Sequence, residues 1–516
     1  MRPGAARAGG RGPGWAPLWL LLAACLPPPL PQPETTERLV ATAATSPYVA
    51  SVLLISVTAP RPASLWIELG TSEDELIAAT PAHKGTEVEL PVLGLKAGHT
   101  YLWRAAARTP DGQRLTSPIA RYTTPTSPSG LDSYTVLRST EASVGGWLLT
   151  SVAQLEAPLS WVGILDRDGD WVWWVPAEEG RIPLSPKLSR DGTAILWGEY
   201  DLDRSQSTLD RSALIRVSLD GSAREQTRLP LGHHDFVEHA DGTIAYLSRS
   251  AAQLGQADAL PVHADRIDLV PRGAGHDVVP QTVFDTFEDY PYPAVSTCAH
   301  MTRIQNTYGS IGPEWTHGNS LLYLDEEDAY YLNARYTDWL LKIDAGTGEV
   351  LWQLNGLDGG FTLPDGSPAW ESPGEAHLWS HGHISQLWSG GMMVFDNGDH
   401  RTKRVSRVLE IALDEDARTA EIVWSYPHPD GRFTPSMGDA RRLPGGNVLT
   451  AWAGLREITE VTPDGSVAWK ARSGRADVVG RITWLPDLAR PSPPSQAPPA
   501  PAPASPEASG DDPDRR

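Results

Sequence analysis

Apolar and polar residues alternate along most of the chain, in short runs that end at Gly, Asp or Pro. Examples are "ASVLLISVTAP" from Ala50, "SLWIELGTS" from Ser64 and "TYLWRAAARTPDG" from Thr100. A period of two between apolar residues is typical of β-strands, and helical periodicity is nearly absent. The pattern predicts an all-β protein.

The first group of predicted strands, at residues 46–125, indicates a small β-sandwich. The stretch "LPVLGLKAGHTYLWRAAA" resembles a fibronectin type III domain, with a corner at Gly98 followed by Tyr101. In such a corner the tyrosine hydroxyl ties down the backbone just before it.

A repeat covers residues 130–488. Its first hairpin begins near Leu184, His234, His317, His383, Gly438 and Gly480, and a second hairpin follows most copies, as in "LKIDAGTGEVLWQL". Two alternating hairpins make one four-stranded blade, so six copies predict a six-bladed β-propeller. The wider spacings leave room for insertions at 251–313 and 355–378, and such loops often lie on the binding face.

Histidines occur where the repeat places strand starts. If the first strand of each blade lines the central channel, then His234, His317 and His383 meet at one mouth of it. The next strand runs back, which puts Arg335 beside His317 and Arg249 in the comparable place of the preceding blade. His233, His239 and His381 flank this group. His381 and His383 alternate so that either could face the axis. The alternative is that each histidine only holds its own blade together.

Composition narrows the possible functions. The 516 residues include 43 basic and 64 acidic ones, a net charge of −21. An acidic chain without a basic run repels a polyanion, so we expect no nucleic-acid partner.

The N-terminus predicts export. Residues 1–24 combine three arginines with the apolar run "WAPLWLLLAA", and "LAAC" ends at Cys25. This resembles the lipobox of bacterial lipoproteins, in which the cysteine is lipidated; a plain signal peptide is the alternative. We expect a cell-envelope protein on a lipid anchor, in the outer membrane if the host is Gram-negative, with a tether at 25–45 and a disordered Pro/Ala-rich tail at 489–516. Only Cys298 then remains, so no intramolecular disulfide is expected.

Several segments of the repeat carry a family resemblance. "HHDFVEHADG", "WTHGNS", "LNARYTDWLLKIDAGTGEVLWQLNG", "FDNG" and "GDARRLPGGN" resemble the bacterial arylsulfate sulfotransferases that do not use PAPS. The resemblance covers about residues 46–488. It implies that His383 is the nucleophile, that His317 and either His234 or His233 are further active-site histidines, and that Arg335 and Asn319 belong to the site. A hairpin one residue shorter leaves His381 as the alternative nucleophile.

The resemblance implies a reaction. A sulfuryl group moves from an aryl sulfate ester to a phenol by a ping-pong mechanism through a sulfohistidine, with His383, His317, His234 and Arg335 as catalytic residues. Asn319, His233, His381 and Arg249 are the expected substrate-binding residues, and no cofactor or metal is implied. The partners are a small phenolic donor and acceptor. Two alternatives stay open: a non-catalytic binding propeller, and a metal-dependent propeller enzyme that uses several histidines.

Overall fold

The computed structural model describes residues 38–153, 159–201, 209–254, 259–290, 292, 298–372, 377–474 and 478–488. The expected signal peptide, Cys25 and the tail at 489–516 lie outside these residues. None of the helices in the described residues is long and apolar enough to cross a membrane.

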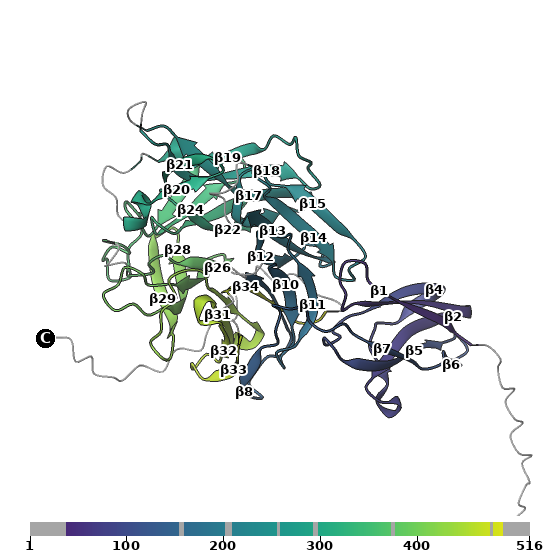
Figure 1. The fold of residues 1–516 in the computed structure, drawn as a ribbon. Coiled ribbons are helices and arrows are strands. Elements are labelled where there is room, and N and C mark those ends of the chain that lie inside the picture. Colours follow the sequence, from purple (N-terminus) through teal and green to yellow (C-terminus); the bar gives the residue numbers. More distant parts are fainter. Residues whose placement is uncertain are drawn as a thin grey trace, which may run out of the picture.

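The N-terminal unit lies outside the ring formed by the rest of the chain (purple in Figure 1). Its strands hydrogen-bond into one connected sheet in which the long strand β2 pairs with β1, β3, β4 and β5. They do not separate into two sheets, so the expected fibronectin-III-like β-sandwich is not confirmed. Strand β1 also lies inside the segment predicted as a tether. The elements are β1 (Val40–Thr45), β2 (Leu53–Gly70), η1 (Glu73–Glu75), β3 (Ile77–Ala78), β4 (His83–Val92), β5 (Thr100–Arg108), β6 (Arg114–Thr116) and β7 (Ala120–Thr123).

The corner in this unit has the predicted tyrosine contact. The backbone N–H of Lys96 donates to the Tyr101 hydroxyl at 3.0 Å. The same loop docks on the propeller, since the Ala97 N–H donates to the Trp171 carbonyl at 3.1 Å and Lys96 Nζ lies 3.0 Å from Asp166 Oδ2. The corner therefore fixes the N-terminal unit against the first blade.

Apart from the separate hairpin of β20 and β21, the remaining described strands form six antiparallel sheets, the blades of a β-propeller, as predicted. In four of the blades the strands pair in chain order, while blade one takes β34 and the last blade takes β8 from the other end of the chain. The innermost strands of neighbouring blades contact one another around the centre. The blades are, in ring order: β9 (Trp147–Ala153), β10 (Trp161–Leu165), β11 (Trp171–Pro176) with β34 (Val478–Leu485); β12 (Arg181–Leu188), β13 (Ala194–Asp201), β14 (Ala213–Ser218), β15 (Arg224–Arg228); β16 (Gly232–Glu238), β17 (Thr243–Ala252), β18 (Val262–Pro271), β19 (Gln281–Asp285); β22 (Gly318–Leu324), β23 (Ala329–Ala334), β24 (Trp339–Asp344), β25 (Val350–Leu354); β26 (His383–Trp388), β27 (Gly391–Asp396), β28 (Arg407–Asp414), β29 (Thr419–Pro427); and β30 (Asp439–Arg442), β31 (Val448–Trp452), β32 (Glu457–Val461), β33 (Val467–Arg472) with β8 (Thr135–Ser139).

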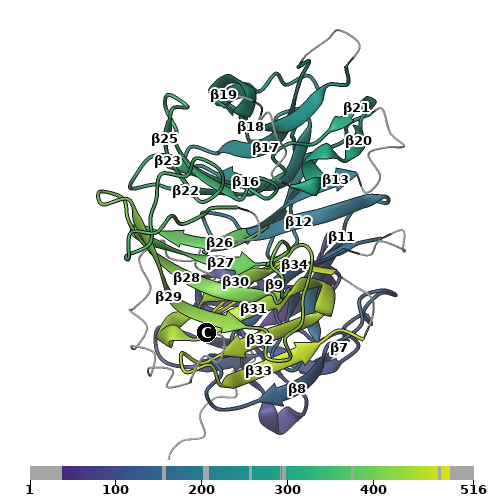
Figure 2. The same ribbon diagram turned by 90° about the vertical axis from the view of Figure 1, so that its left-hand side faces the viewer.

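The ring is closed by pairing strands from opposite ends of the chain. The last strand, β34, pairs with β9 and becomes the innermost strand of the first blade, as Figure 2 shows where the two labels adjoin. Strand β8 adds to the outer edge of the last blade. The incomplete repeat at Gly480 is thus the missing inner strand of blade one.

The segment predicted as an insertion after residue 251 is partly regular blade structure. Strands β18 and β19 complete the third blade. The extra structure lies between blades three and four: α1 (Thr286–Asp289), η2 (Ala299–Thr302), β20 (Ile304–Thr307) and β21 (Ser310–Pro313). Two further short helices, η4 (Pro444–Gly446) and η5 (Ala453–Leu455), belong to the last blade.

Tryptophan fills the spaces between blades. Trp173 and Trp197 pack in one buried cluster that joins blades one and two, and Val49 and Val52 of the N-terminal unit belong to the same cluster. Trp315 and Trp339 lie 5.7 Å apart edge to face in the cluster of blades three and four. Large flat side chains bury much apolar area per residue, which stabilises a ring that lacks one central core.

Candidate functional site

The predicted histidines lie near the starts of inner strands, although not at one register. His383 is the first residue of β26 and His317 immediately precedes β22, but His234 is the third residue of β16. The register of β16 shifts between Gly232 and Phe236, and His234 has the left-handed φ of 55°. His317 and His381 have a similar φ, 57° and 56°, and β22 and β26 also carry a register shift, so counting residues from a repeat start does not fix where these side chains point.

His317 is held by a buried carboxylate. Its Nδ1 lies 2.9 Å from Glu314 Oε2, and the other oxygen of Glu314 accepts from the Arg249 guanidinium. Burial opposes ionisation of Glu314, but the charges of Arg249 and His317 outweigh it and hold its pKa well below the usual value. The charge of Arg249 is therefore compensated inside the protein by Glu314, which also fixes the orientation of the His317 ring.

His233 lies between His234 and a second buried acid, Asp265. The Nδ1 atoms of the two rings are 2.9 Å apart, and His233 Nε2 lies 3.0 Å from Asp265 Oδ1. The rings of His234 and His317 are 4.8 Å apart, edge to face. The structure thus brings His233, His234 and His317 together.

Arg335 lies beside His317, as predicted. Its backbone N–H donates to the His317 carbonyl at 3.0 Å, and its Nη2 donates to the Pro435 carbonyl at 2.6 Å. Its nearest acid is Asp399, 3.8 Å away. Among the described residues, no hydrogen-bond partner meets its buried Nε, so part of the guanidinium is available to an anion.

Asn319 holds the backbone just before His383. Its amide donates to the Gly382 carbonyl at 3.1 Å, and its Oδ1 accepts from Asn333 Nδ2 at 2.6 Å. Asn333 donates to the same Gly382 carbonyl at 2.8 Å. Both amides therefore position the segment that carries His383.

His383 is a buried imidazole, 7% exposed. Its Nε2 has no hydrogen-bond partner in the described part of the chain. Burial first, and then the charges of Arg481 and Arg335, hold its pKa well below the ordinary value, so the ring is neutral. A neutral imidazole with an unused nitrogen among cations is suited to attack an electrophile that carries negative charge.

His381 lies in different surroundings from His383. Its Nε2 faces the Cys298 thiol at 3.3 Å and His400 Nε2 at 2.8 Å, while its Nδ1 is 3.3 Å from Asp399 Oδ2. Burial lowers the pKa of His381 to about 3, although the nearby Asp399 acts to raise it. Side chains thus lie within 3.3 Å of both nitrogens of His381, whereas Nε2 of His383 has no hydrogen-bond partner among the residues that the structure describes.

Arg481, on β34, crosses the centre of the ring. It donates to the Ile384 carbonyl at 2.8 Å, to the Ser320 hydroxyl at 2.6 Å and to Asp235 Oδ2 at 3.2 Å. It also lines a cavity of about 340 Å³ formed by the inner strands, which includes Phe236. Arg481 therefore joins the inner strands of several blades and forms part of the wall of that cavity.

Several site residues escaped the sequence analysis. Tyr336 stacks on His317 with ring centres 4.5 Å apart and lies 5.9 Å from His381. Burial and the charge of Glu314 raise its pKa to about 12, so it stays a hydroxyl donor. Tyr336 directly follows Arg335, and this adjacency was the available signal. Glu314 is likewise three residues before His317.

Comparison with known proteins assigns the family. The family model described as "Arylsulfotransferase (ASST)" matches residues 147–480, well over half of the chain. The chain belongs to the arylsulfotransferase family. This membership supports an aryl sulfotransferase activity, and the matched region covers most of the propeller and every histidine described above.

The comparisons with curated proteins and with solved structures do not narrow the function further. No curated protein matches. Solved structures that match include a protein of unknown function from Bacteroides caccae, 13% identical over 66% of this chain and 98% of that one, with a TM-score of 0.38. Sqt1 from Saccharomyces cerevisiae is 12% identical over 75% of this chain and 82% of that one, with a TM-score of 0.31.

Proposed function

We propose that the protein transfers a sulfuryl group from an aryl sulfate ester to a phenol, without PAPS, through a sulfohistidine at His383. The observation that carries this proposal is the buried His383 ring, whose Nε2 is unused among the described residues. Arg335 supplies the fixed positive charge that a sulfate monoester requires.

In the first half-reaction, the lone pair of His383 Nε2 attacks the sulfur of the donor. The N–S bond forms as the bond from sulfur to the phenolic oxygen breaks, and its electron pair goes to that oxygen. Charge on the equatorial sulfuryl oxygens is met by Arg335, as in phosphoryl transfer, where the transition state is similarly loose. The leaving phenolate takes a proton from His317, whose Nδ1 is held by Glu314.

In the second half-reaction, an acceptor phenol enters. His317, now neutral, takes the phenolic proton while the oxygen attacks sulfur and the N–S bond breaks. The electron pair returns to His383 Nε2, and both histidines regain their starting states. His234, with its ring 4.8 Å from that of His317, helps to orient the sulfuryl oxygens. The order of events gives ping-pong kinetics.

The test uses p-nitrophenyl sulfate as donor and phenol as acceptor. Wild-type protein releases nitrophenol in the presence of phenol, and His383→Ala abolishes the release. With donor alone, intact mass increases by one sulfuryl group, and this increase is absent in His383→Ala. His239→Gln is the matched control, because His239 lies at the other end of β16 and its Nε2 is 2.6 Å from the Tyr330 hydroxyl of blade four. Full activity in His383→Ala contradicts the proposal.

We further propose that Cys25 is lipidated and holds the protein on the cell-envelope membrane. The support is the sequence "LAAC" after an apolar run too short to span a bilayer. Labelled fatty acid is then incorporated in wild-type protein and not in Cys25→Ala, which is recovered from the aqueous fraction. Label in Cys25→Ala, or wild-type protein without label, rejects the anchor.

A further inference from the structure

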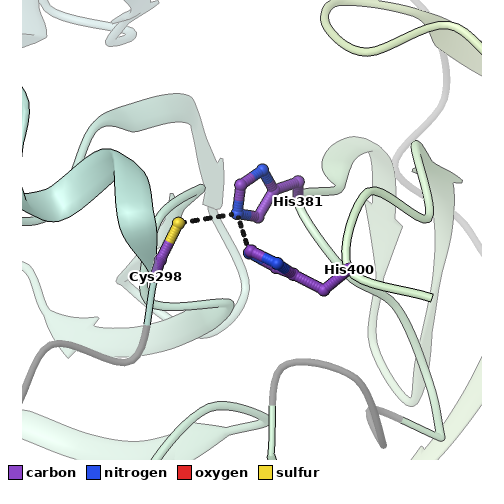
Figure 3. A group of neighbouring side chains, drawn as sticks. All are labelled: Cys298, His381 and His400. Atoms are coloured by element: carbon purple, nitrogen blue, oxygen red, sulfur yellow. Dashed lines mark hydrogen bonds between the residues drawn. The ribbon is translucent and has the colours of Figure 1, made fainter. Parts of the chain in front are cut away.

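We propose that Cys298, His381 and His400 form a binding site for a borderline transition-metal ion, zinc above all, next to the sulfotransferase centre. The three come from distant parts of the chain: Cys298 precedes η2, His381 precedes β26 and His400 follows β27. Figure 3 shows the thiol and the His400 ring both directed at the same nitrogen of His381. Nothing in the proposed sulfuryl transfer uses Cys298 or His400.

The geometry fits a tetrahedral ion. One ligand atom from each residue lies within 4.8 Å of the other two, with Sγ to His381 Nε2 at 3.3 Å and Nε2 to Nε2 at 2.8 Å. Zinc bonds of ordinary length at tetrahedral angles put two nitrogens about 3.3 Å apart, and nitrogen and sulfur about 3.6 Å apart. Outward shifts of about 0.3 to 0.5 Å create that separation, which small ring rotations can supply.

On the side away from the proposed ion, His381 has the kind of contact that metal-binding histidines make. Asp399 Oδ2 lies 3.3 Å from His381 Nδ1, the nitrogen that faces away from the thiol. A carboxylate at this place keeps the proton on Nδ1 and aims Nε2 at the ion. Asp399 also lies 3.7 Å from His300 Nε2, so a further imidazole stands at the edge of the cluster.

The charge balance permits a cation despite the nearby arginine. Arg335 Nη2 is 3.8 Å from Asp399 Oδ2, so this carboxylate stands next to both Arg335 and the cluster. A divalent ion with a Cys298 thiolate and Asp399 carries no net charge. Binding releases the thiol proton to solvent.

The donor set selects the metal. One sulfur and two imidazole nitrogens suit zinc, cobalt or copper, and they disfavour calcium and magnesium, which take oxygen ligands. The cluster also bears on the nucleophile. With Nε2 on the ion and Nδ1 against Asp399, His381 has no nitrogen for a sulfuryl group, which leaves His383. This last step rests on the proposed function; the metal site itself does not.

The experiment measures metal in the purified full-length protein without any sulfate ester. Protein equilibrated with Zn²⁺ and then desalted holds one zinc per chain. Co²⁺ in place of zinc gives a thiolate-to-cobalt absorption band in the near ultraviolet. Cys298→Ser removes the band, and His400→Ala lowers retained zinc at least tenfold. His239→Gln, a histidine outside the cluster, keeps both signals.

Wild-type protein that retains no zinc, or variants that retain as much as wild type, would overturn the proposal. Far-ultraviolet circular dichroism establishes that each variant is folded. If a variant does not fold, the cobalt band of the wild-type protein decides alone: a spectrum without a sulfur band is incompatible with Cys298 as a ligand. Because no substrate is present, loss of sulfotransferase activity leaves this result unaffected.

Discussion

Glu314 Oε2 lies 2.9 Å from Nδ1 of His317, and the same carboxylate neutralises the buried Arg249. One side chain thus orients a proposed proton donor and compensates a charge that water cannot reach. Activity measured on a Glu314 variant reports on the first role, and the stability of the same variant reports on the second.

We expect the Glu314→Gln variant to lose both stability and activity. Because Arg249 is left buried without its counter-charge, we expect a loss of about 3–5 kcal/mol in the free energy of unfolding. We also expect the kcat for nitrophenol release to fall. Urea unfolding and steady-state kinetics measure the two effects. The matched control is Glu225→Gln, because Glu225 pairs with Arg272 at the surface and its loss costs about 1 kcal/mol or less. Equal stability losses in the two variants contradict the assignment.

Arg335→Lys keeps the positive charge and removes the planar fork of donors. We expect kcat to fall by about 100-fold or more, the effect of losing one donor to a transition-state oxyanion. The measurement is nitrophenol release at saturating donor. Arg404→Lys, a more exposed arginine 3.5 Å from Asp399, serves as the control with little change. Unchanged kcat in Arg335→Lys shows that this arginine is not needed in the transition state.

Asn319→Ala tests a positioning role. The amide contacts the Gly382 carbonyl, so its loss loosens the segment before His383. We expect kcat to fall by about 10- to 100-fold while KM for the donor changes little, because a small displacement of a nucleophile affects chemistry more than binding. Asn333→Ala, which removes the second donor to the same carbonyl, lowers kcat in the same way. A rise in KM with unchanged kcat instead indicates direct substrate binding.

We predict that Glu457 stabilises the last blade at neutral pH and that this stabilisation is lost in acid. Burial raises its pKa, but hydrogen bonds from Arg472 and Lys470 outweigh this and leave it below the usual 4.5. A lowered native pKa stabilises the fold above 4.5, and this stabilisation is lost as the pH falls through the native value. Glu457→Gln therefore costs about 1–3 kcal/mol at neutral pH. The difference in melting temperature from wild type narrows in acid; a constant difference would show that the carboxylate charge is irrelevant.

The architecture was predictable because blade repeats leave a periodic pattern. The six hairpin starts, including the incomplete one at Gly480, correspond to inner strands of six blades. The contact between Arg335 and His317 followed from antiparallel pairing alone. The single sheet of the N-terminal unit was not predictable, since strand pattern does not reveal that β2 pairs with partners along both halves of its length.

The finer geometry of the site depends on features that the pattern does not record. A bulge and a left-handed backbone place His234 within its strand. Cys298 meets His381 only because a segment between blades three and four reaches the fifth blade, to which His381 and His400 both belong. His381 and His383 looked equivalent in sequence, and their surroundings separate them. Nε2 of His381 contacts Cys298 and His400 and its Nδ1 lies 3.3 Å from Asp399, whereas Nε2 of His383 has no hydrogen-bond partner in the described part of the chain.

The pairing of β34 with β9 has a consequence for how the protein is made. The ribosome produces β9 well before β34, so blade one lacks its inner strand until residue 485 has been made. Arg481 also arrives with β34, and it is the side chain that ties several inner strands together. The centre of the ring is therefore assembled only after β34 has been made, and shorter products of synthesis lack the contacts of Arg481.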